Sequence, residues 1–267
     1  MKPEQRHAAF VHASAMQMRG SRLIGFSHTS AAALRALPRI TPWPTRIAVT
    51  STRPTVRSSG LVKRHIGEVD EYDVIDGLLV TTLTRTIIDI ARAEELPDAV
   101  AAADHALHHK LCTREELMAE LDKVPVGARG RARAALVVDF AEPGAMSVGE
   151  SLSRVQMFRL NVPRPQLQVP IEDDDGLVGI CDFWWKRERV VGEFDGLKKY
   201  QVDEGMAAEE VTQVLWREKK REDRIRATDR RMARWVWAEA TRPQLMVARL
   251  AAQGVRPTAR NEWFDAA

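Results

Sequence analysis

The sequence has few of the features that mark secreted or membrane proteins. Only two cysteines, Cys112 and Cys181, occur among 267 residues, and they form no Cys-X-X-Cys motif. Two cysteines provide no disulfide framework, so we expect a reducing, cytoplasmic environment. No apolar run reaches the roughly 18 residues of a membrane helix. The opening stretch MKPEQRHAAFVHASAM also lacks the apolar centre of a signal peptide. We therefore expect no membrane partner.

The chain also lacks a strong net charge. Its 40 Lys and Arg residues nearly balance 37 Asp and Glu residues, giving a net charge of +3. Affinity for nucleic acid would therefore require local basic clusters rather than the field of the whole protein. An apolar content of 45% and a charged content of 29% are typical of a globular protein. The length suits two modest domains.

Hydrophobic periodicity divides the chain near residues 141–146, Ala-Glu-Pro-Gly-Ala-Met. We predict one domain over residues 1–142 and a second over residues 147–267. Thr113 and Glu116 form a capping box that marks one helix start. The first domain is expected to have helices at 4–18 and 27–37, strands at 46–51, 60–67 and 72–82, and helices at 82–93, 96–110, 112–123 and 130–141.

The second domain is predicted to follow the order αβββαβα, so both halves belong to the α+β or α/β class. We expect a helix at 147–161, strands at 165–172, 178–186 and 189–195, a helix at about 204–229, a strand at 232–239 and a helix at 241–254. The alternating Trp235 and Trp237 are expected to lie in the core of the last strand.

Three acidic residues of the second domain fall at comparable places on these elements. Glu150 lies in the first turn of the leading helix, Asp182 interrupts an apolar strand, and Glu193 ends the third strand. A lone buried carboxylate is costly, so Asp182 should be paired, hydrogen-bonded or metal-bound. Carboxylate oxygens favour Mg²⁺ or Mn²⁺, which could bind a phosphodiester and supply a hydroxide.

Each acid also has a structural interpretation. Glu150 is a first-turn acid that the helix dipole favours. Asp182 is equally an acceptor of structural hydrogen bonds, and Glu193-Phe194-Asp195 is a strand end that enters a solvated turn. Only the joint placement of the three acids favours a metal site.

The long helix before the last strand is basic. Residues 216–234 contain nine basic and four acidic residues. These side chains could contact phosphates, or they could form a solvated face with internal ion pairs. The same alternatives apply to a basic strip before the domain boundary. The candidate nucleic-acid contacts are Arg217, Lys219, Lys220, Arg221, Arg224, Arg129 and Arg131.

Four segments of the second domain together resemble a known nuclease core. They are GESLSR (149–154), CDFWW (181–185), VGEFDG (191–196) and WREKKREDRIRATDRRMARWVWAE (216–239). Their order resembles the restriction-endonuclease-like αβββαβ core of PD-(D/E)XK nucleases, and more closely the Vsr-like group called DUF559. The resemblance implies a metal-dependent DNA endonuclease in phage defence, toxin–antitoxin function or DNA repair.

The nuclease resemblance implies particular roles for the acids. Glu150, Asp182 and Glu193 would bind Mg²⁺ or Mn²⁺. The lysine usual two residues after the strand glutamate is Asp195 here. Either of the two following lysines, Lys198 or Lys199, would then supply the catalytic cation from a shifted position.

The first half of the chain resembles another family. SHTSAAALRALP, RIAVTS and DVIDGLLVTTLTRTIIDIARAEELPDAVAAADHAL, within about residues 22–125, are similar to AbiEi type IV antitoxins. Gly77, Val80-Thr81-Thr82 and Arg85-Thr86 occupy the places of that family's recurring phrase. The resemblance implies a mixed domain after an incomplete winged helix, with DNA and a cognate nucleotidyltransferase toxin as partners.

The two resemblances leave more than one function open. The first is a DNA endonuclease. The alternative is an antitoxin and transcriptional regulator whose nuclease-like domain is catalytically inactive. A structural interaction protein is a third interpretation, although it leaves the acid within the strand, Asp182, unexplained. A homodimer is compatible with each.

Overall fold

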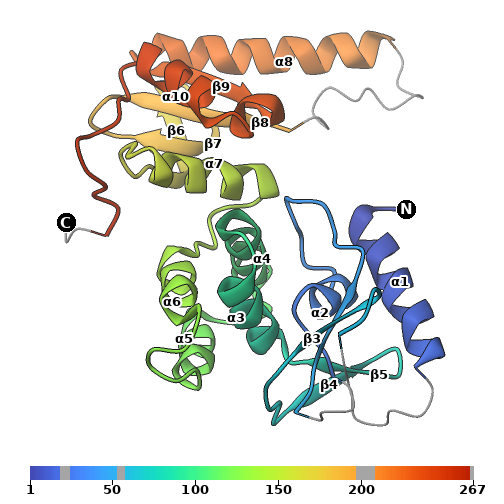
Figure 1. Cartoon of the computed structure of the whole chain (residues 1–267). Coiled ribbons are helices and arrows are strands. Elements are labelled where there is room, and N and C mark those ends of the chain that lie inside the picture. Colours follow the sequence, from blue (N-terminus) through green and yellow to red (C-terminus); the bar gives the residue numbers. More distant parts are fainter. Residues whose placement is uncertain (19–24, 53–57, 197–207, 265–267) are drawn as a thin grey trace. The chain divides into compact units, whose positions relative to one another are not determined.

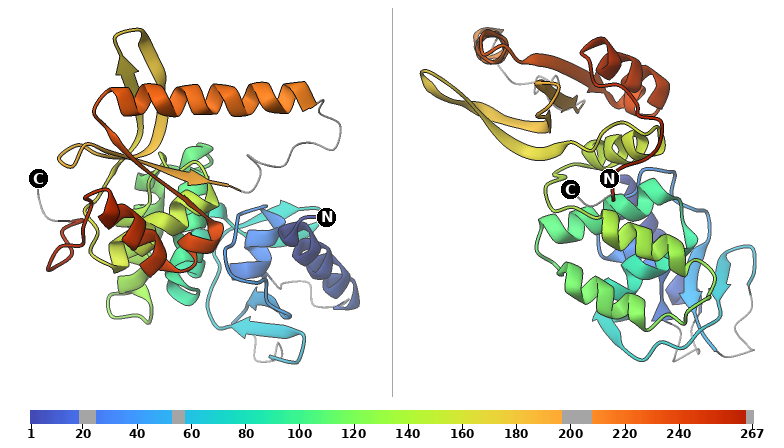
Figure 2. Two further views of the ribbon diagram at one scale, coloured as in Figure 1. Left: turned by 90° about the horizontal axis from the view of Figure 1, so that it is seen from above. Right: turned by 90° about the vertical axis from the view of Figure 1, so that its left-hand side faces the viewer.

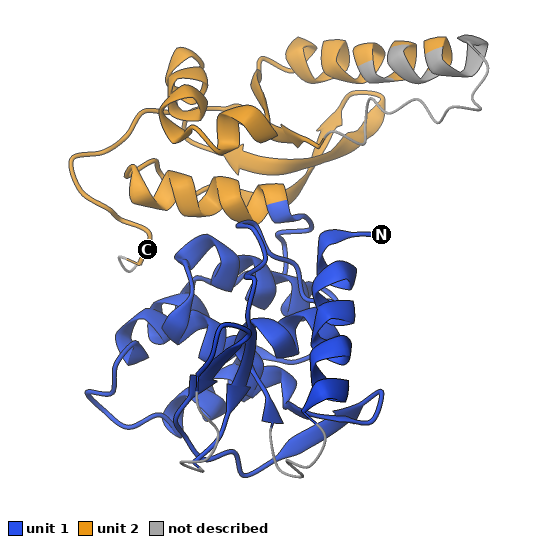
Figure 3. Cartoon of the chain, turned by 45° about the vertical axis from the view of Figure 1, so that its right-hand side comes forward, with its two compact units in different colours: residues 1–148 blue, residues 149–267 orange. Residues whose placement is uncertain are grey.

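The computed structural model describes residues 1–18, 25–52, 58–196 and 208–264. The chain divides into two compact units, residues 1–148 and 149–267 (Figure 3). Each unit combines helices with one mixed sheet, as the α+β prediction required. None of the helices in the described ranges is long and apolar enough to cross a membrane.

Unit 1 contains a five-stranded sheet in the order β3-β2-β1-β5-β4. The β1–β5 and β2–β3 pairs are parallel, whereas β1–β2 and β4–β5 are antiparallel. Its elements are α1 (Pro3–Gln17), β1 (Gly25–Phe26), α2 (His28–Leu34), β2 (Ile47–Thr50), β3 (Val62–His65), β4 (Tyr72–Ile75), β5 (Leu78–Thr81), α3 (Leu83–Ala93), α4 (Leu96–His108), α5 (Arg114–Asp122) and α6 (Arg131–Phe140).

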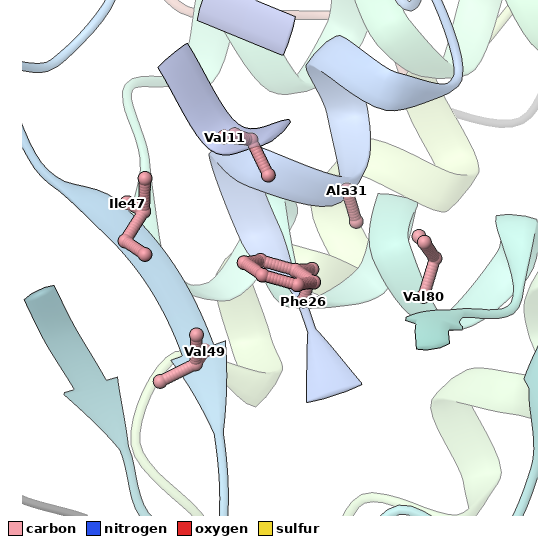
Figure 4. Packing of buried hydrophobic residues seen from close by; sticks show 6 residues of the cluster. All are labelled: Val11, Phe26, Ala31, Ile47, Val49 and Val80. Carbon is pink, nitrogen blue, oxygen red and sulfur yellow. The ribbon is translucent and has the colours of Figure 1, made fainter. Parts of the chain in front are cut away.

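The unit 1 sheet packs against α1 and α2 through small and branched apolar side chains. Figure 4 shows this cluster, in which Phe26 of β1 lies among Val11, Ala31, Ile47, Val49 and Val80. The sequence pattern predicts no strand at β1, because two residues are too few to show alternation. The strand nevertheless joins β2 to β5, so Phe26 lies at the centre of the sheet.

Two helices of unit 1 begin at side-chain caps. The Thr113 side chain accepts the Glu116 amide at 3.2 Å, and the Glu116 carboxylate accepts the Thr113 amide at 2.8 Å. This confirms the predicted capping box. Thr82 caps α3 by accepting the Arg85 amide. Ser27 precedes α2, but its side chain makes no capping hydrogen bond to that helix.

Unit 2 has a four-stranded sheet in the order β6-β7-β8-β9, antiparallel except for the parallel β8–β9 pair. Helices α7 and α8 lie on opposite faces of this sheet (Figures 1 and 2). The elements are α7 (Val148–Arg159), β6 (Gln166–Asp173), β7 (Gly176–Trp185), β8 (Val190–Asp195), α8 (Ala208–Ala227), β9 (Arg231–Val236), α9 (Trp237–Ala240) and α10 (Pro243–Ala252).

Two apolar layers hold unit 2 together. On the α8 side, Ile225 packs with the strand residues Ile171, Cys181, Val191 and Met232. Burial raises the pKa of the Cys181 thiol to about 12, so it stays protonated and acts as a small apolar group.

Aromatic rings form the second layer, where Trp235 of β9 meets α7. The Trp235 indole N–H donates to the Ser153 hydroxyl at 2.8 Å, and its ring lies 5.2 Å from that of Phe183. The strand predicted to reach residue 239 instead ends at Val236, and Trp237 begins α9. The reason is local, because the Glu239 carboxylate accepts the Val236 amide at 3.1 Å and closes a helical turn. Trp237 is therefore only half-buried, contrary to the prediction.

Gly192 of β8 provides a test of this aromatic layer. A Cβ at that position would lie 2.8 Å from the Trp185 ring and 2.9 Å from the Trp235 ring. We expect Gly192→Ala to lower the free energy of unfolding by about 1–3 kcal/mol through overpacking. Gly196→Ala is the control, since its Cβ would meet only an ordinary contact at 3.8 Å. Urea unfolding followed by tryptophan fluorescence measures both, and equal effects would contradict the packing argument.

Candidate functional site

Glu193 is the most deeply buried of the three predicted acids, with 1% of its surface exposed. Arg234 of β9 is its partner in the parallel register, and the Arg234 guanidinium lies 2.9 Å from Glu193 Oε2. Arg221 of α8 donates to Glu193 Oε1. Two guanidinium groups therefore compensate the negative charge of the buried carboxylate, which would otherwise be unfavourable in the interior.

Asp182 and Glu150 have different polar partners. Asp182 Oδ2 accepts the Phe194 amide at 2.8 Å, so this carboxylate completes the backbone hydrogen bonding of β8. Glu150 is buried in α7, and its Oε2 accepts from the Gln168 side-chain amide of β6 at 3.2 Å. These contacts of the three predicted ligands are made with different partners.

A metal site would require several of these donors to converge. Within the described ranges, no group of three or more His, Cys, Asp or Glu side chains is arranged to hold a metal ion. Asp195 is buried at the end of β8, while Lys198 and Lys199 lie outside the described residues. The Mg²⁺ or Mn²⁺ site therefore stays a prediction.

The predicted nucleic-acid contacts divide into internally bonded and exposed side chains. Arg224 donates to both carboxylate oxygens of Asp173, at 2.8 and 2.6 Å, and this contact lowers the pKa of Asp173. Arg221 contacts Glu193, and Arg131 donates to the backbone carbonyls of α5 and its following turn. The exposed members are Arg217, Lys219, Lys220 and Arg129.

Unit 1 contains a basic cavity that the sequence analysis did not identify. Its volume is about 470 Å³, and it is lined by His28, Thr50, Lys63, His65, Ile66, Arg85, Asp89, Arg92, Ala93, Arg129 and Arg133. Arg85, Asp89 and Arg92 are spaced at i, i+4 and i+7, so they form one polar stripe on the otherwise apolar α3. That stripe is the sequence pattern that could have indicated the cavity. The residues that face it come from distant parts of the chain, so the pattern alone does not predict the other walls.

Two histidines at one wall of this cavity are held neutral. The rings of His28 and His65 stack with centroids 3.4 Å apart. Burial, and then the nearby Lys63, lowers the pKa of His65 from 6.5 to about 4. Burial and the neighbouring His65 lower the pKa of His28 well below its ordinary value. Neutral rings can stack closely without the repulsion of two imidazolium ions.

The arginines around Glu193 allow a test of its role. We expect Glu193→Gln to lower the free energy of unfolding by about 3 kcal/mol, because it leaves two guanidiniums beside a neutral amide. Asp229→Asn is the control, because Asp229 and its partner Arg189 are both exposed and such a pair contributes about 1 kcal/mol or less. Urea titration measures both variants. A Glu193→Gln protein that is as stable as wild type, with thermal stabilisation of wild type by Mg²⁺, would instead favour a metal ligand.

The lowered histidine pKa values predict a pH dependence of stability. The pKa of His65 is about 4 in the folded chain and ordinarily 6.5, so the unfolded chain binds more protons between these values. The contribution of the neutral His65 ring to the free energy of unfolding is fully present above pH 6.5 and is lost as the pH falls toward 4. Unfolding free energies at about pH 7.5 and about pH 5 should differ less for His65→Gln than for wild type. An equal difference would contradict this assignment.

In comparisons with known proteins, one family model matches part of the chain. The family model described as the AbiEi antitoxin C-terminal domain matches residues 15–138. Two curated relatives from Mycobacterium tuberculosis are uncharacterized protein MT2308 of strain CDC 1551 / Oshkosh and uncharacterized protein Rv2248 of strain ATCC 25618 / H37Rv. Each is 31% identical over 146 residues, which are 55% of this chain and 52% of the relative.

The chain thus spans about half the length of the curated relatives that it matches. No solved structure matches the chain. The comparisons give no support to a Vsr-like nuclease domain. For the first half, the family match includes the residues whose pattern resembled AbiEi antitoxins, and residues 15–138 contain an AbiEi antitoxin C-terminal domain.

Proposed function

We propose that this protein is an AbiEi-type antitoxin, which neutralises a cognate toxin protein and regulates transcription by binding DNA. The observation that supports this proposal is the AbiEi antitoxin C-terminal domain at residues 15–138. That match covers most of unit 1, including all five strands of its sheet. We therefore place the toxin-binding function in unit 1.

In this proposal unit 2 binds DNA without cutting it. The buried Glu193 is already compensated by Arg221 and Arg234, and Asp182 accepts a backbone amide. These contacts support a structural use of the acids in place of metal-dependent hydrolysis. The exposed Arg217, Lys219 and Lys220 of α8 supply positive charge for phosphate contacts.

The toxin partner can be tested in cells. If the gene beside this one encodes a nucleotidyltransferase, we expect co-expression of the full chain to restore growth that this toxin arrests. The two proteins should also co-purify. Phe26→Ala is a useful negative control, because loss of this core ring at 5% exposure should cost about 3–5 kcal/mol of stability. Absence of both growth rescue and co-purification would reject the toxin partner.

The DNA contact can be tested by charge removal on α8. We expect Arg217→Ala with Lys220→Ala to reduce the slope of log affinity against log salt by about 1–2, because each lost phosphate contact contributes close to one. Lys186→Ala with Arg187→Ala is the matched control, since it removes one exposed lysine and one exposed arginine elsewhere in unit 2. Mobility shift with the protein's own promoter at several salt concentrations measures the slopes. Equal slopes for both variants would exclude this face of α8.

A further inference from the structure

The basic cavity of unit 1 has more positive than negative charge at its walls. Lys63, Arg129 and Arg133 line it together with Arg85 and Arg92. The last two also border a second cavity, which contains four acids, Glu68, Asp70, Glu71 and Glu120. Lys63, Arg129 and Arg133 line the basic cavity but not the second one. The acids of the second cavity therefore do not explain the charge of these three residues.

Asp89 is the acid among the described residues that line this cavity. It is 2% exposed and accepts the Arg85 Nε–H at 3.1 Å through both of its oxygens. One buried carboxylate that is already paired with Arg85 leaves the charges of Lys63, Arg129 and Arg133 in excess.

Backbone carbonyls hold two of the guanidiniums in place. Arg133 Nε donates to the Ala91 carbonyl at 3.0 Å, and its Nη2 donates to the Arg92 carbonyl. Arg92 Nε donates to the Arg129 carbonyl at 3.3 Å. A carbonyl fixes the orientation of a guanidinium without neutralising its charge, so these groups are prepared to bind an anion.

The histidine wall offers a further polar group. Within the part of the chain that the structure describes, the buried His65 Nε2 has no hydrogen-bond partner. A buried nitrogen of this kind usually bonds to a ligand or an ordered water. The stacked His28 has a φ of +48°, a left-handed conformation that residues other than glycine adopt uncommonly. Such strained residues are concentrated at binding sites.

We propose that this cavity binds a small phosphate-bearing anion, held by Lys63, Arg129, Arg133 and the His65 imidazole. A volume of about 470 Å³ is within the usual range for small-molecule sites, roughly 300–1,000 Å³, and leaves room for an organic group beside the phosphate. Guanidinium forks match the oxygen geometry of phosphate, and the lysine adds a point charge. None of the α8 residues proposed above to contact DNA lines this cavity.

Calorimetric titration of the full chain tests the proposal. The probes are inorganic phosphate and ribose 5-phosphate, at an ionic strength kept constant with sodium chloride. We expect saturable binding, and we expect Lys63→Ala with Arg129→Ala to weaken it by about tenfold or more. Arg46→Ala with Lys110→Ala is the matched control, because it removes an exposed arginine and an exposed lysine of unit 1 outside the cavity. This control should bind within about twofold of wild type.

A second measurement separates binding from loss of folding. Phosphate should shift the side-chain ¹⁵N resonances of His65 in wild type and in the Arg46, Lys110 control. Tighter binding of ribose 5-phosphate than of phosphate assigns the site to an ester, whereas equal affinities assign it to free phosphate. Absence of heat and of a His65 shift with both probes would overturn the proposal. Equal weakening in both double variants, or binding of duplex DNA alone, would also overturn it.

Discussion

Burial of a carboxylate demands a compensating charge or several hydrogen bonds, and this demand organises both units. In unit 2, Glu193 of β8 receives Arg221 from α8 and Arg234 from β9, so one acid connects a helix and two strands. In unit 1, Asp98 of α4 accepts the amides of Ile40 and Thr41 at 2.8 and 2.9 Å. In both cases the ionic group specifies which segments meet, while apolar packing supplies most of the stability.

In the basic cavity of unit 1, positive charge exceeds negative charge. There the cations outnumber the acids, and carbonyls orient them without cancelling their charge. A compact fold keeps such an arrangement at a cost in repulsion, which an anionic ligand would relieve. The neutral stacked histidines lower that repulsion, because protonated rings would add two more positive charges. A ligand site within unit 1 would allow a small anion to influence the toxin contact that we propose for this unit.

The acidic residues of unit 2 illustrate how one pattern supports two uses. Glu150, Asp182 and Glu193 were predicted to bind a metal ion, and each contacts an amide or a guanidinium. A metal centre and an ion-pair network can use the same acidic residues at the same strand positions, because both place positive charge beside a buried carboxylate. Only the neighbouring cations distinguish them, and the arginines that approach Glu193 lie 28 and 41 residues later in the chain.

The sequence by itself determined most of the order of elements, because periodicity and capping are local. The Thr113 capping box, the long α8 and the three strands before it follow from neighbouring residues. The AbiEi resemblance also followed from local phrases around Arg85-Thr86. The two-residue strand β1, the partners of Glu193 and the walls of the basic cavity were decided by tertiary structure alone. They depend on contacts between residues far apart in the chain, and no local periodicity records which distant charge will neutralise a buried one.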